Sequence, residues 1–166
     1  MNAKPNAAHV ALARLQDKFD VSIITQNIDD LHERAGSTNV LHLHGEIFKS
    51  RSSVNPSLIY TIPGAELNIG DTCEQGSQLR PHIVWFGELV PALEDAASLV
   101  SIADIFLVVG TSLAVYPAAG LINYASLQSE KYIVDPTAGE ISGFIAYREK
   151  AGTGIPLLVN KFLNYN

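Results

Sequence analysis

The stretch IFLVVGTS, residues 105–112, decides the fold class of this chain. Its first five residues are all apolar, and a short apolar run without polar alternation is typical of a strand that is covered on both faces. Glycine, threonine and serine follow directly, and such residues commonly end a strand in a turn. We therefore predict a buried parallel strand over residues 105–109 with a polar loop at its carboxyl end.

Helical and strand-like segments alternate on both sides of this strand. The predicted helices are residues 7–19, a short one ending at 35, 93–103, 118–127 and 155–163, and the predicted strands are residues 21–24, 40–43, 82–86, 105–109 and 132–134. This alternation predicts an α/β fold, a Rossmann-like doubly wound parallel sheet with crossover helices.

One segment interrupts the alternation. Residues 49–79 are rich in Ser, Asn, Gly and Pro, and they contain only a weak strand pattern at 58–62. We interpret residues 49–79 as a small insertion into a Rossmann-like lobe made of residues 1–48 and 80–166.

Composition narrows the class of protein. The chain has 166 residues, 47% of them hydrophobic, so it has enough apolar residues for a core. Its net charge of -6 disfavours nucleic acid as a partner. The single cysteine, Cys73, excludes an intrachain disulfide and any zinc site with two or more thiolates. Charges within the first 20 residues argue against a signal peptide or membrane span, so we expect a cytoplasmic protein without a membrane partner.

Polar clusters follow three of the predicted strands, at residues 25–29, 42–46 and 110–112. Open α/β sheets bind ligands at the carboxyl ends of their strands, so the three clusters predict one crevice. Each has a structural explanation when taken alone, as a helix cap, a surface histidine or a turn. His42 and His44 should point to opposite faces of a strand, and we assign His44 to the crevice. The Trp85–Phe86 pair is also consistent with simple core packing, which we expect for Trp85.

Taken together, the motifs resemble one family. They are AKPNAAH at 3–9, TQNIDDLHERAG at 25–36, LHGE at 43–46, RPHIVWFGE at 80–88, ADIFLVVGTSLAVYPAAGL at 103–121 and IPLLVNKFL at 155–163. In content and order they resemble the sirtuins, NAD-dependent protein lysine deacylases, and most closely the bacterial desuccinylase-type members. The resemblance is loose only over residues 50–77 and 135–153.

The resemblance implies an enzyme that transfers an acyl group from lysine to ADP-ribose with nicotinamide release. Its general base would be His44, because a histidine near its ordinary pKa accepts a hydroxyl proton at neutral pH. Asn27 would act with it. NAD would be bound by Gln26, Asn27, Ile28, Asp29, Gly110, Thr111, Ser112, Val115 and Ala151, and the acyl-lysine protein or peptide by Val84, Phe86, Gly87 and Glu88. Val84 to Glu88 would form a strand that pairs with the peptide.

The sequence departs from the family pattern in three respects. The first glycine is Gly36, so the Gly-rich cofactor loop and the first strand of the sheet are expected to be absent, and NAD binding should be weaker. Ser52 replaces one zinc cysteine and only Cys73 remains, so we predict no zinc and a looser, partly mobile insertion. Ile133 replaces an asparagine expected near the adenosine ribose.

A sheet truncated at its central first strand should have two unpaired edges or a gap. We expect that a homo-oligomer or a complementing N-terminal segment supplies the pairing, or that the neighbouring strands close up, or that the chain is a fragment. The leading function is a sirtuin-type deacylase that is inactive in isolation if the cofactor loop is essential. The alternatives are a non-catalytic module that binds acyl-peptide or ADP-ribose, and an unrelated nucleotide-binding domain. Acyl preference is left open.

Overall fold

The structure is a computed structural model that describes residues 2–64, 66–111 and 116–164. The chain divides into two compact units. Unit 1 comprises Met1–Ile24, Leu31–Leu41 and Leu93–Asn166, and unit 2 comprises Thr25–Asp30 and His42–Ala92. The predicted insertion, residues 49–79, lies wholly within unit 2.

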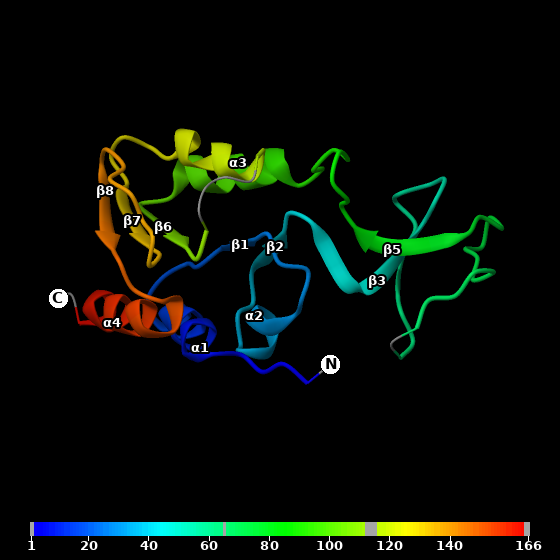
Figure 1. The fold of residues 1–166 in the computed structure, drawn as a ribbon, viewed down its shortest axis with the longest axis horizontal. Helices are drawn as coiled ribbons and strands as arrows, with labels where there is room; N and C mark the ends of the chain where they lie inside the picture. The colour runs from blue at the N-terminus through cyan, green and yellow to red at the C-terminus, as the bar shows by residue number, and fades with distance from the viewer. Residues whose placement is uncertain (1, 65, 112–115, 165–166) are drawn as a thin grey trace. The chain divides into compact units, whose positions relative to one another are not determined.

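Unit 1 is built around a three-stranded parallel sheet with the order β6-β7-β8 (Figure 1). Its elements are α1 (Ala7–Arg14), the 3-10 helix η1 (Leu15–Asp17), α2 (Leu31–Arg34), α3 (Leu93–Ile102), β6 (Ile105–Val109), the 3-10 helix η2 (Ala118–Tyr124), β7 (Glu130–Val134), β8 (Phe144–Tyr147) and α4 (Ala151–Leu163). The strand predicted over residues 105–109 is confirmed as β6, which pairs with β7 in register from Ile105 opposite Glu130.

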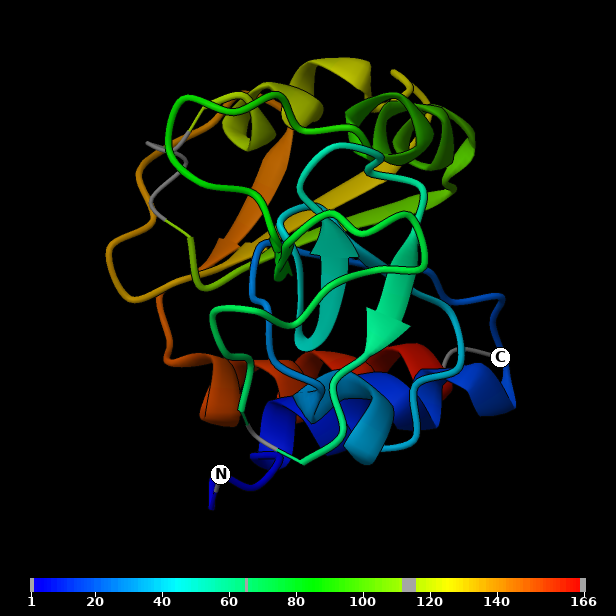
Figure 2. The same cartoon turned by 90° about the vertical axis from the view of Figure 1, so that its right-hand side faces the viewer.

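Helices α1 and α4 lie side by side over this sheet (Figures 1 and 2). Asn6 caps α1 by accepting hydrogen bonds from the backbone N–H groups of Ala8 and His9. Leu12 of α1, Ile155 and Phe162 of α4 and Tyr132 of β7 are buried in one apolar cluster. Burial of each large side chain contributes about 1.5–3 kcal/mol, so this cluster is the main core of the unit.

The central part of the sheet is split. β1 (Ile23–Thr25) and β2 (Val40–His42) form a separate two-stranded sheet, and β1 is not paired with β6. Ile23 N–H donates to Asn39 O and Leu43 N–H donates to Thr25 O, so β1 and β2 run in the same direction. The expectation that the neighbouring strands close up is therefore wrong, because β1 and β6 remain in different sheets.

Unit 2 contains an antiparallel sheet with the order β4-β3-β5, made of β3 (Gly45–Ser52), β4 (Ile59–Thr61) and β5 (Leu79–Ile83). The weak strand pattern at 58–62 is confirmed as β4. The strand predicted at 82–86 is wrong in its bounds, because β5 ends at Ile83. Residues 84–88 form a turn, so the strand expected at Val84 to Glu88 is not present.

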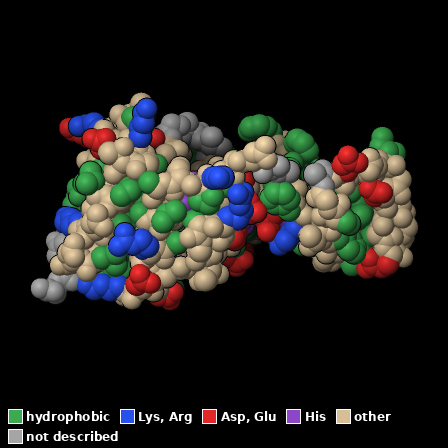
Figure 3. Space-filling model, turned by 90° about the horizontal axis from the view of Figure 1, so that it is seen from below, with side chains coloured by type: hydrophobic (Ala, Val, Ile, Leu, Met, Phe, Trp, Pro, Cys, Tyr) green, Lys and Arg blue, Asp and Glu red, His purple; other side chains and the backbone are tan. Residues whose placement is uncertain are grey.

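Two further features concern the surface. Among the described residues, no helix is both long and apolar enough to cross a bilayer. On the face drawn in Figure 3, acidic and basic side chains are both present, and apolar side chains lie between them.

Candidate functional site

Two of the predicted polar clusters lie side by side in unit 2. The segment that follows β1 is bonded to the segment that follows β2: Leu43 N–H donates to Thr25 O at 2.9 Å, and Ile47 N–H donates to Ile28 O at 2.8 Å. Asn27 N–H also donates to the Thr25 hydroxyl at 3.1 Å. These bonds hold Gln26, Asn27, Ile28 and Asp29 against residues 42–47.

His44 is anchored to this segment through one ring nitrogen. Its Nδ1 lies 3.0 Å from the carbonyl oxygen of Gln26 and the side chain is half-buried. A carbonyl only accepts, so Nδ1 carries the proton and donates it. The same ring then presents Nε2 without a proton, and this nitrogen can act as a base.

The prediction that His42 and His44 point to opposite faces is wrong. Residues two apart on a strand point to the same face, and here His44 lies in a turn after β2 ends at His42. His42 Nδ1 lies 3.1 Å from the carbonyl oxygen of Asn27, the residue beside Gln26. Both histidines are therefore bonded to the same short segment.

Gly45 links His44 to the predicted peptide-binding residues. Its φ of +78° falls in the left-handed region, and a Cβ at this position would lie 2.0 Å from the backbone oxygen of His82. This close approach of β3 and β5 allows Val84 N–H to donate to His44 O at 2.9 Å. Glycine is required here because no side chain fits between the strands.

The turn at residues 84–88 is held by a carboxylate. Glu88 accepts hydrogen bonds from Arg80 Nη1 at 2.7 Å, from Arg51 Nη2 at 3.4 Å and from Trp85 N–H at 3.1 Å. The hydrogen bond from Arg80 lowers the pKa of Glu88, and the Trp85 N–H and the charge of both arginines act in the same direction. Phe86 at the apex is fully exposed. The hydrogen bonds of Glu88 therefore fix a turn whose aromatic ring, Phe86, is exposed to solvent.

We expected Trp85 to pack in a core, and this is wrong, since 53% of its surface is exposed. Its backbone N–H donates to Glu88 at 3.1 Å. His82 precedes this turn on β5. Burial lowers the pKa of His82, and the positive charge of Arg51 adds to the effect.

Three of the other predicted NAD-binding residues belong to unit 1. Gly110 follows β6 with a φ of +60°, and its Cβ would meet no atom of the described residues within 4 Å other than those of its chain neighbours, which leaves its backbone open to a ligand. Thr111 comes next, and Ala151 begins α4. Ser112 and Val115 lie outside the described residues.

The surroundings of Cys73 do not fit a tetrahedral zinc site. Cys73 is buried, and burial raises its pKa, but hydrogen bonds from the hydroxyls of Ser52 and Ser77 and from the backbone of Gln75 and Ser77 outweigh that effect, so the pKa is lowered. The Ser52 hydroxyl also accepts N–H groups of Val54 and Asn55 at 3.2 and 3.1 Å. Within the described residues, no group of three or more His, Cys, Asp or Glu is placed to hold a metal. Hydroxyl and amide contacts surround this thiol instead of further thiolates.

The chain is an α/β protein in which two histidines are bonded to a Gln-Asn-Ile-Asp segment at the end of a strand. Comparison with known proteins identifies its family. The Sir2 family model matches residues 1–117. The chain belongs to the Sir2 family, and its fold is the Rossmann-like α/β fold of Sir2 structures.

Three relatives illustrate the similarity. An NAD-dependent protein deacylase of Aggregatibacter actinomycetemcomitans is 58% identical over 134 residues, which are 81% of this chain and 64% of the relative. The crystal structure of a Sir2 homolog–NAD complex has a TM-score of 0.82 and 38% identity, covering 96% of this chain and 65% of the other. A Sir2–p53 peptide–NAD+ structure has a TM-score of 0.76 and 33% identity, covering 98% and 72%. The chain thus spans less than two thirds of the first two relatives.

Proposed function

We propose that this chain carries the catalytic base and the peptide-binding turn of an NAD-dependent protein lysine deacylase. The observation that carries the proposal is His44, whose Nδ1–H is fixed on Gln26 O so that Nε2 is the basic nitrogen. Two relatives support the reaction class, since one is an NAD-dependent protein deacylase and another is a Sir2 homolog bound to NAD.

The proposed role of His44 is proton transfer. Its Nε2 accepts a proton from a hydroxyl held beside residues 26–29, and its Nδ1–H remains on the Gln26 carbonyl throughout. When NAD is bound, it supplies a glycosidic bond that is labile because the leaving ring is cationic. Asn27, Ile28 and Asp29 would hold the carboxamide of the cofactor, and Gln26 would orient its ribose.

The unit 1 residues Gly110, Thr111 and Ala151 would contribute further contacts to NAD, with Ser112 and Val115. The exposed backbone at Gly110 fits this role, because a positive φ without a side chain permits close approach of a ligand.

The proposed substrate is an acyl-lysine protein or peptide. The turn at residues 84–88 supports this, because Val84, Phe86 and Gly87 lie in a segment that is outside the sheet yet fixed by Glu88. An extended peptide could pair with the backbone of such a segment, and Phe86 would lie against the acyl chain. A solved relative bound to a p53 peptide supports a peptide ligand. A cytoplasmic location stays a prediction from the composition.

Nicotinamide release from NAD in the presence of an acyl-lysine peptide tests the function. We expect His44→Ala to abolish release, because it removes the ring that is held on the Gln26 carbonyl and carries the assigned base. His42→Ala is the matched control, since it removes the neighbouring histidine that is also bonded to this segment, and it should retain release. Equal loss in both variants would contradict the assignment of the base. Peptide binding without any release by the unaltered chain would favour the non-catalytic module.

A further inference from the structure

The basic side chains of unit 2 are gathered on the paired strands β3 and β5. They are Lys49, Arg51 and Arg80, and unit 2 has no others in its sequence. The chain as a whole has a net charge of -6, so this cluster is a local exception. In the antiparallel register Arg51 lies directly opposite Arg80. Like charges at such positions destabilise a sheet, and residues that break a local rule are expected at functional sites.

The two arginines share a single carboxylate. Glu88 Oε1 accepts a hydrogen bond from Arg80 Nη1 at 2.7 Å, and its Oε2 accepts one from Arg51 Nη2 at the longer distance of 3.4 Å. Lys49 has a carboxylate of its own, because its Nζ lies 2.6 Å from Glu46 Oε2. Within the described part of the chain, one positive charge of the Arg51–Arg80 pair therefore has no matching carboxylate.

Both guanidinium groups also have unused donors. Nε and Nη2 of Arg80 and Nε and Nη1 of Arg51 have no hydrogen-bond partner among the described residues. The side chain of Arg51 is 14% exposed and that of Arg80 is 30% exposed, so both charges are partly withdrawn from water, which strengthens an ion pair formed there. His82, also on β5, adds no positive charge, because burial and the charge of Arg51 lower its pKa.

The arginine pair lies beside the turn that we propose to bind the peptide. Glu88 Oε2, which accepts from Arg51, also accepts the Trp85 N–H at 3.1 Å. Arg51 Nη2 lies 3.5 Å from the carbonyl oxygen of Ile83, the last residue of β5. The guanidinium groups are therefore one carboxylate away from the backbone of residues 84–88. An extended peptide rises about 3.3 Å per residue, so a peptide paired with this segment brings the residues nearest its acyl-lysine past the arginine pair.

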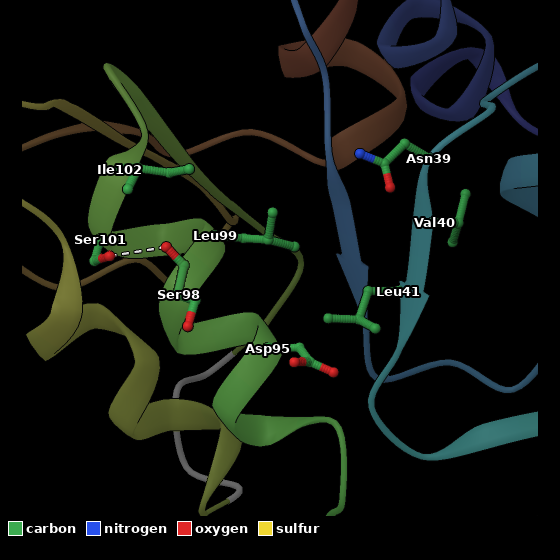
Figure 4. A pocket seen from close by; sticks show the side chains of 8 residues that line it. All are labelled: Asn39, Val40, Leu41, Asp95, Ser98, Leu99, Ser101 and Ile102. Atoms are coloured by element: carbon green, nitrogen blue, oxygen red, sulfur yellow. Dashed lines mark hydrogen bonds between the residues drawn. The ribbon is translucent and has the colours of Figure 1, made fainter.

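The hollow of unit 1 is not an alternative site for an acidic side chain. Its volume is ≈ 450 Å³, and β2 and α3 line it (Figure 4). Leu41 and Leu99 line it from opposite sides, and its one charged lining residue is Asp95. The negative charge of Asp95 would repel a carboxylate.

We propose that the Arg51–Arg80 pair binds the carboxylate of an aspartate or glutamate within about three residues of the acyl-lysine, so that the preferred substrates are acidic peptides. The inference rests on the proposed function in one respect, namely that the peptide pairs with residues 84–88. Charge complementarity identifies the occupant, because a second carboxylate would match the second guanidinium group. Its two oxygens would accept from donors that Glu88 leaves unused, and guanidinium groups suit such planar acceptors.

Paired acetyl-lysine peptides test the proposal on the 166-residue chain. Each labelled peptide has blocked ends and one glutamate or one glutamine, placed at one of the three positions on either side of the acetyl-lysine, with no other charged side chain. In fluorescence polarisation the glutamate peptide should bind about threefold to tenfold more tightly than its glutamine partner at one or more positions. Raising the salt concentration should reduce this ratio. A ratio of one at every position, or no binding of any peptide, would overturn the proposal.

Two variants should move this ratio in opposite directions. Arg80→Gln removes one positive charge and should bring the ratio close to one. Glu88→Gln keeps an acceptor oxygen for the Trp85 N–H but removes the negative charge, so the ratio should rise above that of the unaltered chain. Lys49→Gln is the matched control and should leave the ratio unchanged, because Lys49 is already paired with Glu46. A fall in both Arg80→Gln and Glu88→Gln, or an equal fall in Lys49→Gln, would refute the assignment to the arginine pair.

A carboxylate could also reach the arginine pair from the acyl group itself. A succinyl-lysine peptide without acidic residues separates this source from a flanking residue. Tighter binding of succinyl-lysine than of acetyl-lysine that Arg80→Gln removes, with no effect of any flanking glutamate, would show that the proposal is wrong.

Nicotinamide release from NAD is measured with the same peptides. Release together with equal binding of the glutamate and glutamine peptides would overturn this inference alone. A glutamate preference without any release would contradict the proposed function and leave this inference standing.

Discussion

Replacing Gly45 by alanine tests the close packing that connects His44 to the turn at residues 84–88. The φ of +78° costs a non-glycine residue about 1 kcal/mol. In addition the new Cβ would lie 2.0 Å from His82 O, where ordinary contacts begin at 3.4 Å, so β5 must move by about 1.4 Å. Overpacking of this kind costs about 1–3 kcal/mol, and the Val84–His44 hydrogen bond contributes about 1 kcal/mol more. We expect Gly45→Ala to lower the free energy of unfolding of unit 2 by about 3–5 kcal/mol.

Gly76→Ala is the matched control. Gly76 has a φ of +76° and also lies in unit 2, and apart from its chain neighbours no atom of the described residues lies within 4 Å of where its Cβ would be. Gly76→Ala should therefore lower the free energy of unfolding only by the conformational cost, about 1 kcal/mol. The difference between the two variants isolates the contact between β3 and β5.

Urea unfolding followed by tryptophan fluorescence measures this difference. Trp85 is the single tryptophan and belongs to unit 2, so the signal reports on the unit that is altered. With a slope of about 1–2 kcal/mol per molar urea, a difference of about 2–4 kcal/mol should separate the two midpoints by about 1–4 M. Equal midpoints for Gly45→Ala and Gly76→Ala would refute the packing argument, because the strain is the same at both positions.

Three further predictions concern other parts of the chain. Gly154→Ala should destabilise unit 1 by about 1–2 kcal/mol in thermal unfolding, because its Cβ would lie 2.6 Å from a buried valine of β7. Gly152→Ala is the control in the same helix. It has open space for its Cβ and should stabilise unit 1 by about 0.5 kcal/mol. The pKa of Glu88 is lowered in the folded state, mainly by Arg80, so Glu88 contributes to stability above the ordinary carboxyl pKa, and this contribution is lost as pH falls through the folded pKa. Glu88→Gln should therefore make the free energy of unfolding depend less on pH on the acid side, as pH-dependent unfolding measures. Because Cys73 is surrounded by hydroxyls, purified protein should hold far less than one zinc per chain by mass spectrometry of metals. EDTA should leave its melting temperature unchanged. One zinc per chain would contradict this prediction.

Periodicity predicted most elements of unit 1, but it missed β8, Phe144–Tyr147, where the sequence analysis expected no strand. The run at β6 has no helical alternative at its length, and the apolar spacing of α1 and α4 matches the sides that they bury. The split between β1 and β6 was one of the outcomes that the sequence left open, beside direct pairing of the neighbouring strands.

Unit 2 was harder to predict, because its strands depend on pairing rather than on apolar pattern. β3 reads GEIFKSRS and carries charged residues in its interior, and its partner β5 includes a proline. Such strands are stabilised by their antiparallel neighbours, which a local pattern does not reveal. The turn at residues 84–88 was interpreted as a strand because V-W-F has high strand propensity. Its conformation depends instead on the bonds to Glu88 from Arg80 and from Arg51, and Arg51 is distant in sequence.

The pairing of α1 with α4 has a consequence for synthesis of the chain on the ribosome. Helix α1, Ala7–Arg14, leaves the ribosome before α4, Ala151–Leu163, which covers it. At about 5–20 residues per second, translation leaves the apolar side of α1 without its partner for about 10–30 s. During that interval Leu12 and its neighbours are a ready binding site for chaperones, and variants that slow the final docking step should be lost to proteolysis before they are lost to equilibrium unfolding.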